Sequence, residues 1–208
     1  LSEDDLKRND MYRANAQRAK AQSRFADYHD YLLSLEMTAE IGDFPPLYLQ
    51  RITQLTNKSN QFNLTTKRYT AEQMEAVYNS DEYIRLYGKL YDKFGDNGVV
   101  AVTIGKTDSE DKGRLDIELW LMSCRVLKRD MELAMLDSLV AQAKKRGIRE
   151  IYGHYYPTAK NKMVAGLYES FGFEKISQDE EGNTAWRLLV EGYEDKNTVI
   201  KVKEEHYA

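Results

Sequence analysis

The strand–helix–strand unit over residues 115–156 constrains the fold of this chain more than any other feature. Residues 115–123 (LDIELWLMS) are apolar and strand-like, and residues 148–156 predict a second strand. Between them, residues 130–146 have one apolar helical face and end in three basic residues, and Gly147 follows at the position where helices commonly end. A chain with this unit needs a sheet that is covered by at least one helix.

The other predicted elements extend this unit into a mixed α/β domain. Three strand-like runs are separated by polar turns, one at residues 95–98 and one near Gly113, which predicts an antiparallel meander. We therefore expect a mixed, mostly antiparallel sheet flanked by helices and preceded by an N-terminal helix. The predicted strands are 37–44, 83–94, 99–106, 115–123, 148–156, 173–177 and 184–190, and the predicted helices after the N-terminal one are 46–58, 70–79, 130–146 and 159–171.

Both ends of the chain are polar. Residues 1–36 contain no Pro or Gly and predict a helical segment that Ser2 can cap. Residues 37–195 hold the α/β elements, and the charged residues 196–208 are expected to fray as a C-terminal tail. Because the chain begins with Leu1, we interpret it as a piece of a longer protein, with residues 1–36 as the end of a preceding domain.

Composition excludes some classes of function. A net charge of −4 over 208 residues provides no basic excess for binding nucleic acid. No apolar run approaches the roughly 20 residues of a membrane helix and no targeting segment is recognised, so we expect a cytoplasmic protein without nucleic-acid or membrane partners. The single cysteine, Cys124, cannot form an internal disulfide and is expected to be a buried small residue. No metal-ligand cluster is recognised.

Residues 57–66 (NKSNQFNLTT) are unusually rich in amides and hydroxyls. Such side chains favour helix caps and turns, so one interpretation is a capped corner between two helices. The other is a segment that reads a neutral polar ligand, such as a pantetheine or glyceryl group. Both interpretations stay open from the sequence.

Residues 161–173 (NKMVAGLYESFGF) resemble the second cofactor motif of GNAT acyltransferases. In that family the fourth and fifth strands run parallel and splay apart, and the pantetheine arm of an acyl thioester lies in the wedge and pairs with exposed strand backbone. The resemblance implies the GNAT acyl-CoA N-acyltransferase fold, with Asn161 at the pantetheine and Tyr168 as the acid that protonates the departing thiolate. Tyr168 could instead be an ordinary core residue.

The loop before residue 130 corresponds to the family's pyrophosphate motif, which is Arg or Gln, two residues, Gly, one residue, then Gly or Ala. One register retains Arg125 and replaces the glycines with Lys128 and Asp130, and a second register starts at Leu127. Side chains at these positions hinder close approach of the backbone to a phosphate, which argues against tight binding of free coenzyme A. The implied site for acetyl-CoA or another pantetheine thioester comprises Met122, Cys124, Arg125, Lys128, Arg129 and Asn161.

Acyl transfer to an amine also requires a base near the thioester. Glu118, in the middle of its strand, is the candidate base, and His154 on the next strand is the alternative. A solvated sheet face explains the carboxylate equally well, and a lone strand histidine is more often structural. Strand alternation predicts that one face carries Asp116 and Glu118 and the other carries Ile117, Leu119 and Leu121.

A more specific resemblance covers nearly the whole chain. Five phrases are similar to the C-terminal region of FkbH-like proteins, which join a HAD-type domain of subfamily IIIC to a GNAT-like domain. The resemblance implies that residues 1–36 leave the HAD domain, and that the parent enzyme loads a glyceryl group onto an acyl carrier protein for polyketide-type biosynthesis. The phrases are YLLSLEM (31–37), RITQLTNKSNQFNLTTKRYT (51–70), KFGDNGVVAV (93–102), LMSCRVLKRDME (121–132) and YGHYYPTAKN (152–161).

Two functions follow from this resemblance. In the first, the chain binds a pantetheine thioester, as acyl-CoA or on acyl carrier protein, during transfer of an acyl or glyceryl unit. In the second, it is a catalytically degenerate module that docks acyl carrier protein or braces the HAD domain. Arg125, Lys128 and Arg129 would then form a basic patch for the acidic carrier protein.

Overall fold

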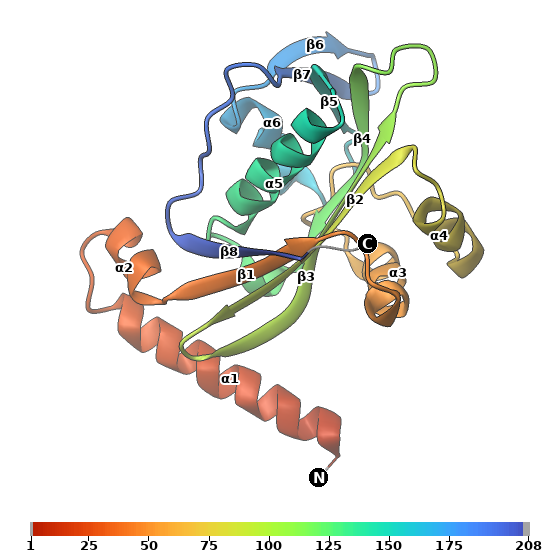
Figure 1. The fold of residues 1–208 in the computed structure, drawn as a ribbon. Helices are drawn as coiled ribbons and strands as arrows, with labels where there is room; N and C mark the ends of the chain where they lie inside the picture. The colour runs from red at the N-terminus through yellow and green to blue at the C-terminus, as the bar shows by residue number, and fades with distance from the viewer. Residues whose placement is uncertain (1, 206–208) are drawn as a thin grey trace.

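A computed structural model of the chain describes residues 2–205 and shows one twisted sheet with helices on both faces (Figure 1). Within these residues the sheet has eight strands in the order β6-β7-β5-β4-β3-β2-β1-β8. Only the β4–β5 and β1–β8 pairs are parallel, so the predicted mixed and mostly antiparallel sheet is confirmed. The strands are β1 (Met37–Gly42), β2 (Tyr83–Asp92), β3 (Gly95–Thr107), β4 (Arg114–Met122), β5 (Glu150–Tyr155), β6 (Glu174–Gln178), β7 (Thr184–Leu189) and β8 (Ile200–Glu205).

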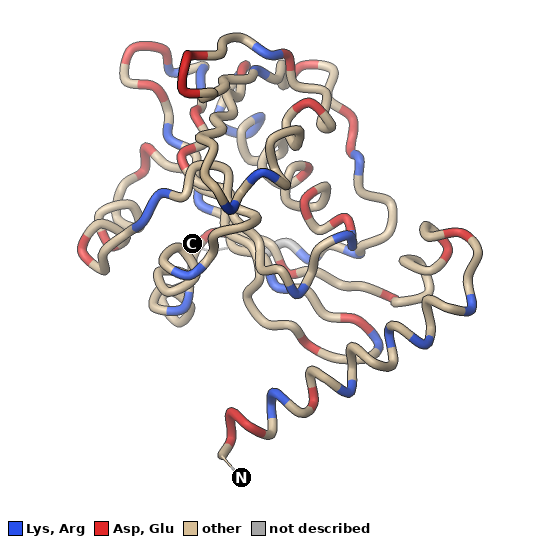
Figure 2. The backbone as a smooth tube through the Cα atoms, turned by 180° about the vertical axis from the view of Figure 1, so that it is seen from behind, with Lys and Arg blue, Asp and Glu red and all other residues tan. Residues whose placement is uncertain are grey.

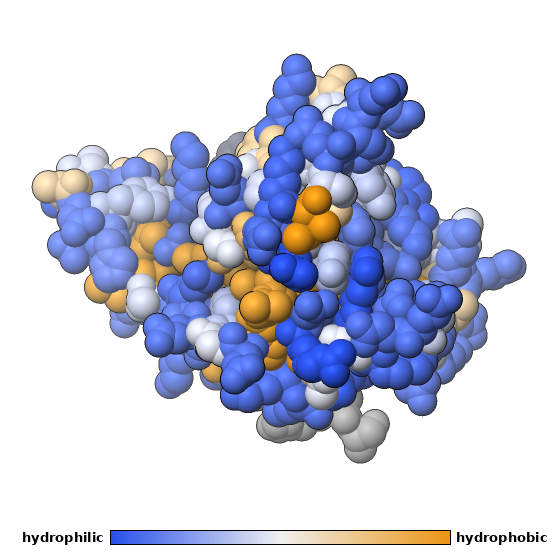
Figure 3. All heavy atoms as spheres, turned by 90° about the horizontal axis from the view of Figure 1, so that it is seen from above, coloured by the Kyte–Doolittle hydropathy of each residue, from blue (hydrophilic) through white to orange (hydrophobic). Residues whose placement is uncertain are grey.

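The helices divide between the two faces of the sheet (Figure 1). Helices α5 and α6 contribute to one apolar core, and α3 and α4 to a second core on the opposite face. Seen from above, the surface is mainly hydrophilic and apolar side chains are confined to small areas (Figure 3), as expected when the sheet and helices enclose the core. The helices are α1 (Glu3–Gln22), α2 (Tyr28–Ser34), η1 (Pro46–Tyr48), α3 (Leu49–Lys58), α4 (Ala71–Tyr78), η2 (Cys124–Val126), α5 (Met131–Lys145), η3 (Lys162–Val164) and α6 (Leu167–Ser170).

Two predicted helices are interrupted. The expected segment 1–36 is divided into α1 and α2, because Asp27 accepts a hydrogen bond from the His29 backbone and starts a new helix there. The expected helix 159–171 consists of the short elements η3 and α6, and Gly166 lies between them. No helix in residues 2–205 is long and apolar enough to cross a membrane.

The C-terminal tail is part of the sheet. Residues 196–208 were expected to fray, which is wrong for β8, because β1 offers it an unpaired edge and the Asn197 side chain accepts hydrogen bonds from the Val199 and Ile200 backbones. Asp137 of α5 fixes the preceding segment by accepting from the Tyr193 hydroxyl at 2.5 Å and from two further backbone N–H groups. Leu1 and residues 206–208 lie outside the described part of the chain.

A buried ion cluster attaches α1 to the sheet. Asp92, at the end of β2, accepts two hydrogen bonds from Arg18 of α1, at 2.7 and 2.9 Å, and lies 3.7 Å from the Arg129 guanidinium. The same carboxylate accepts from the backbone N–H groups of Phe94 and Gly95, which places the hairpin turn at residues 93–94. The turn expected at residues 95–98 therefore lies inside β3, and α1 packs on the hairpin with its acidic residues near the N-terminal end (Figure 2).

Replacing Asp92 tests this attachment. We expect Asp92→Ala to lower the free energy of unfolding by about 3–5 kcal/mol, because two arginines would stay buried without their shared carboxylate. The matched control is Asp10→Ala on the exposed face of α1, whose ion pair with Arg13 lies in solvent and should contribute less than about 1 kcal/mol. Urea unfolding of both variants measures the difference, and equal effects would contradict a structural role for the cluster.

Candidate functional site

Strands β4 and β5 separate and leave a wedge. Their parallel pairing covers only Arg114–Asp116 against Glu150–Tyr152, although β4 continues to Met122 and β5 to Tyr155. Beyond the last pair the facing edges of the two strands do not bond to each other. This is the splayed geometry that the GNAT resemblance implies.

A β-bulge at Glu118 marks the start of the wedge. Ile117 pairs with Gly105 and Leu119 pairs with Ile104, so Glu118 is the extra residue on β4. Such a bulge bends its strand and reverses the alternation of side chains beyond it. Ile117 therefore packs in the α5 core, whereas Leu119 and Leu121 pack in the α3–α4 core. The prediction that these three side chains share one face is wrong for this reason.

The wedge is occupied by residues 62–65 of the chain itself, here named the wedge segment. The Leu64 N–H donates to the Trp120 carbonyl at 3.0 Å, and the Met122 N–H donates to the Phe62 carbonyl at 3.0 Å. On the β5 side, the Tyr156 N–H donates to the Leu64 carbonyl at 2.9 Å. The segment thus lies between β4 and the residue that follows β5, and one isolated antiparallel bridge, Asn63 with Leu121, joins it to β4.

Side chains fix the wedge segment at both ends. The buried Asn161 amide donates to the carbonyls of Asn63 at 2.9 Å and Tyr156 at 3.0 Å, and its oxygen accepts from the Thr158 N–H at 2.7 Å. The Thr65 hydroxyl donates to the Glu118 carbonyl at 2.7 Å. Asn161, which the resemblance places at the pantetheine, is here bonded to the chain's own backbone.

A pantetheine arm does not fit this arrangement. The strand groups with which it would pair, the Trp120 carbonyl and the Met122 N–H, are already bonded to the wedge segment. Leu64 fills the space between the strands with no exposed surface. Either the segment withdraws or no thioester enters the wedge.

The loop before α5 has the backbone of the pyrophosphate motif but not its surroundings. Lys128 and Asp130 have φ angles of 65° and 66°, the left-handed conformation that favours glycine, which selects the register that starts at Arg125. The Tyr28 hydroxyl of α2 donates to the Lys128 carbonyl, so the N-terminal helices cover the loop. Burial raises the pKa of Glu132 at the start of α5. A covered loop with an adjacent carboxylate is a poor site for a pyrophosphate.

The predicted basic patch is not one surface. Lys128 is exposed and Arg125 is half-buried, but the Arg129 guanidinium is buried and points toward Asp92. Burial lowers the pKa of Arg129, and the charge of Arg18 lowers it further. Arg129 is therefore a structural residue of the ion cluster in this structure.

The two candidate catalytic groups lie on different sides of the sheet. Tyr168 of α6 is 1% exposed and packs in the α5 core, and within residues 2–205 its hydroxyl forms no hydrogen bond of normal geometry. Burial raises the pKa of Tyr168, and a weak interaction of its oxygen with the His154 backbone N–H opposes this. Glu118 lies on the opposite face, near Tyr69 of the α3–α4 core, and forms a 3.1 Å ion pair with Lys67.

His154, the alternative base, is held by a carboxylate. Its Nε2 lies 2.7 Å from Asp116, which also accepts from Arg114 at 2.9 Å. Burial alone would raise the pKa of Asp116, but the hydrogen bonds from His154 and Arg114 outweigh it and lower that pKa. The arrangement orients the imidazole at the point where β4 and β5 separate.

A basic cavity of about 780 Å³ lies at the mouth of the wedge. The exposed thiol of Cys124 lies there, 3.2 Å from the Gln61 side-chain oxygen, so the prediction of a buried cysteine is wrong. Met122, by contrast, is buried at the end of β4. The cationic side chains that line this cavity are Arg51, Lys58, Arg125 and Lys160.

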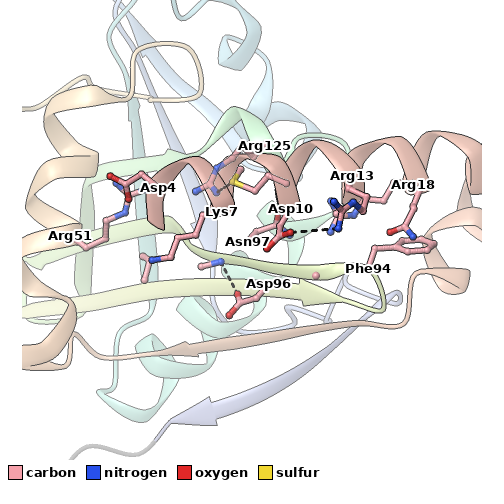
Figure 4. A pocket seen from close by; sticks show the side chains of 16 residues that line it. Asp4, Lys7, Asp10, Arg13, Arg18, Arg51, Phe94, Asp96, Asn97 and Arg125 are labelled. Carbon is pink, nitrogen blue, oxygen red and sulfur yellow. Dashed lines mark hydrogen bonds and ion pairs between the residues drawn. The ribbon is translucent and has the colours of Figure 1, made fainter. Parts of the chain in front are cut away.

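The positive charge at the mouth is concentrated. Burial lowers the pKa of Arg125, and the nearby charge of Arg51 lowers it further. Both residues also line the adjoining cavity of about 1000 Å³ between α1 and the β2–β3 hairpin (Figure 4). Sequence reasoning missed Arg51, Lys58 and Lys160, because Arg51 and Lys58 lie on α3 whereas Lys160 lies in the loop after β5, and no spacing along the chain connects that helix with that loop. No group of three His, Cys, Asp or Glu side chains in residues 2–205 could hold a metal ion.

The packing of Tyr168 on β5 can be tested at Gly153. A Cβ atom at this position would lie 2.5 Å from the Tyr168 ring. We expect Gly153→Ala to lower the free energy of unfolding by about 1–3 kcal/mol through overpacking. Gly166→Ala, where nothing lies within 4 Å of the added atom, should change it little. Thermal unfolding compares the two, and a fully tolerated Gly153→Ala would contradict the tight contact.

Comparison with known proteins identifies the fold. No family model and no curated protein matches the sequence. Among solved structures, the ribosomal-protein-S18-alanine N-acetyltransferase from Escherichia coli is similar with a TM-score of 0.55 and 14% identity, covering 77% of this chain and 99% of that chain.

Two further structures agree. The putative acetyltransferase yncA from Salmonella typhimurium, solved with its cofactor acetyl-CoA, has a TM-score of 0.55 and 14% identity over 76% of this chain and 96% of that chain. The GNAT domain of S. lividans PAT has a TM-score of 0.55 and 15% identity, covering 72% of this chain and 89% of that chain. The chain therefore has the GNAT acyl-CoA N-acyltransferase fold, which these acetyltransferases share.

Proposed function

We propose that this chain is a GNAT-fold module that docks acyl carrier protein through the basic mouth of its wedge. The main observation in support is that the wedge segment occupies the wedge, while the cationic side chains at its mouth still line an open cavity. These side chains are Arg51, Lys58, Arg125 and Lys160. The resemblance to FkbH-like proteins supports a parent enzyme that loads an acyl or glyceryl unit for polyketide-type biosynthesis. In that parent, α1 and α2 would follow a HAD domain.

Electrostatics supports a carrier protein as the partner. Carrier proteins are acidic, and a concentrated positive surface attracts an acidic partner and orients it. This chain has a net charge of −4, so its basic mouth stands out against an acidic remainder. Arg51 and Lys58 lie on α3, a rigid helix directly before the wedge segment.

Free acyl-CoA is a poorer candidate ligand. Its pyrophosphate would meet a loop covered by Tyr28 and flanked by the Glu132 carboxylate. A carrier protein presents its arm without this pyrophosphate–adenosine part, so the same loop does not oppose it.

Acyl transfer is the second candidate function, and one observation favours it. The hydroxyl of Tyr168 is buried in the core, and among the described residues its only hydrogen-bonding contact is a weak one with the His154 backbone, which is unusual for a polar group in a core. In an open wedge it could donate a proton to a departing thiolate, and Glu118 or the His154–Asp116 pair could accept a proton from the acceptor. Transfer from an acyl carrier thioester to any acceptor would support this candidate, and Tyr168→Phe should lower the rate without unfolding the protein.

Charge reversal tests the docking proposal. We expect Arg51→Glu with Lys58→Glu to weaken binding of an acyl carrier protein at least about 10-fold, since attractive contacts become repulsive. The control is Lys144→Glu with Lys145→Glu, which makes the same charge change in the last turn of α5. Calorimetric titration at low ionic strength measures both, and equal binding by the two double variants would exclude the basic mouth as the docking surface.

Thermal stability with acetyl-CoA tests the ligand preference. Binding to the native state raises the melting temperature, whereas a covered pyrophosphate loop predicts no binding. We therefore expect about 1 mM acetyl-CoA to shift the melting temperature of the wild-type chain by less than about 1 °C. A clear concentration-dependent increase would contradict the preference for a carrier-borne arm.

A further inference from the structure

The wedge is built to bind an extended chain that carries amides. The Trp120 carbonyl accepts from such a chain, and the Met122 and Tyr156 N–H groups donate to it. The Asn161 side chain donates to a further amide carbonyl, that of Asn63. Four groups from β4 and the loop after β5 therefore converge on the backbone of the occupant, and they recognise amides at set spacing without regard to its side chains.

A phosphopantetheine arm has the same chemistry as the wedge segment. It is an extended chain with two amide groups, each of which offers one N–H and one carbonyl. The groups that bind the backbone of residues 62–65 could bind those amides equally well. The wedge segment is thus equivalent to a pantetheine arm supplied by the chain itself.

The wedge segment belongs to no helix, although its release would take Phe62 and Leu64 out of the core that also contains α5 and α6 side chains. It lies between the end of α3 at Lys58 and the start of α4 at Ala71, in a connection without regular secondary structure apart from one isolated bridge to Leu121. The connection is also strained, because Thr66 is β-branched and has a φ of 50°. Left-handed backbone is disfavoured for such a residue, so release of the wedge segment would relieve the backbone strain at Thr66.

We propose that residues 62–65 are a displaceable occupant of the wedge, and that the pantetheine arm of a docked carrier protein takes their place. This inference rests on the proposed docking function and adds its consequence for the wedge. In the closed state Tyr168 is sealed from solvent. Displacement removes Phe62 and Leu64 from the core that also contains Tyr168, so we expect arm entry to bring access to Tyr168.

Hydrogen exchange of three amides tests displacement directly. Thr65→Val keeps the side-chain volume but removes the hydroxyl that donates to the Glu118 carbonyl. We expect the Leu64, Met122 and Tyr156 amides to exchange about 5- to 10-fold faster in this variant, the value expected for the loss of one hydrogen bond. Thr53→Val, which removes a hydroxyl bonded within α3, is the control and should leave these three amides unchanged.

Added carrier protein distinguishes displacement from simple loosening. With carrier protein bearing its arm, the Met122 and Tyr156 amides should become protected again while the Leu64 amide stays fast, because the arm replaces the segment on the strands. Protection of Leu64 together with the other two would overturn the proposal. Free pantetheine provides the same readout without protein docking, so it tests the wedge even if carrier protein does not bind.

A cross-link that holds the wedge segment in place is the opposite of the loosening expected from Thr65→Val. The chain has one cysteine, Cys124, whose sulfur lies 3.2 Å from the Gln61 side-chain oxygen, next to the wedge segment. Gln61→Cys therefore places a second thiol near Cys124, so an added oxidant can form a disulfide or a short bis-alkylating reagent can bridge the two sulfurs, and mass spectrometry verifies that the segment is tied in place. We expect the bridged protein to bind carrier protein with and without its arm equally, while the reduced protein prefers the form with the arm.

The outcomes distinguish failure of the displacement inference from failure of the proposed docking of acyl carrier protein. If the preference for the arm persists after bridging, or is absent before it, the wedge segment is not displaced and the inference fails. If neither form of carrier protein binds the reduced protein, the docking proposal fails. In that case the response of the Leu64 amide to free pantetheine still decides whether the segment can be displaced.

Discussion

The structure depends on how the unpaired edges of β4 and β5 are satisfied. The bulge at Glu118 bends β4 away from β5 and leaves backbone groups of Trp120 and Met122 in the protein interior. Buried backbone groups without partners are costly, so something must pair with them. In this chain the wedge segment does so, and the same demand would be met by a pantetheine arm.

The N-terminal helices and the loop before α5 form a second linked system. Asp92 holds Arg18 of α1 and faces Arg129 of the loop, while Tyr28 of α2 bonds to the loop backbone at Lys128. A loop with these contacts cannot receive a pyrophosphate without rearrangement of α1 and α2. The mouth of the wedge stays open beside them, which is why docking at the mouth is more consistent with the structure than binding of free coenzyme A.

Several parts of the fold followed from local patterns. The apolar face of α5 and the Gly147 that follows it, the meander of β2 to β4 and the helix expected at residues 70–79 depend on neighbours in sequence, so the sequence predicts them. The expected fraying of residues 196–208 failed because β8 depends on an edge of β1, about 160 residues away along the chain. The face expected for Ile117 failed because a bulge reverses alternation, and β4 carries no glycine or proline that would indicate one.

The sequence by itself determined the order of the strands and helices from β1 to β7 and the motif at residues 161–173 that contains Tyr168. The register of the pyrophosphate loop was open in the sequence and was selected by the left-handed backbone of Lys128 and Asp130. Only the tertiary structure decided what fills the wedge. Residues 57–66 left two interpretations open. The structure shows the capped corner, which Asn63 holds through hydrogen bonds with Ser59 and Thr66, while recognition of a ligand by this segment stays a prediction. Hydrogen bonds between residues 64 and 120, or 63 and 161, join segments distant in sequence, and no local pattern of side chains encodes them.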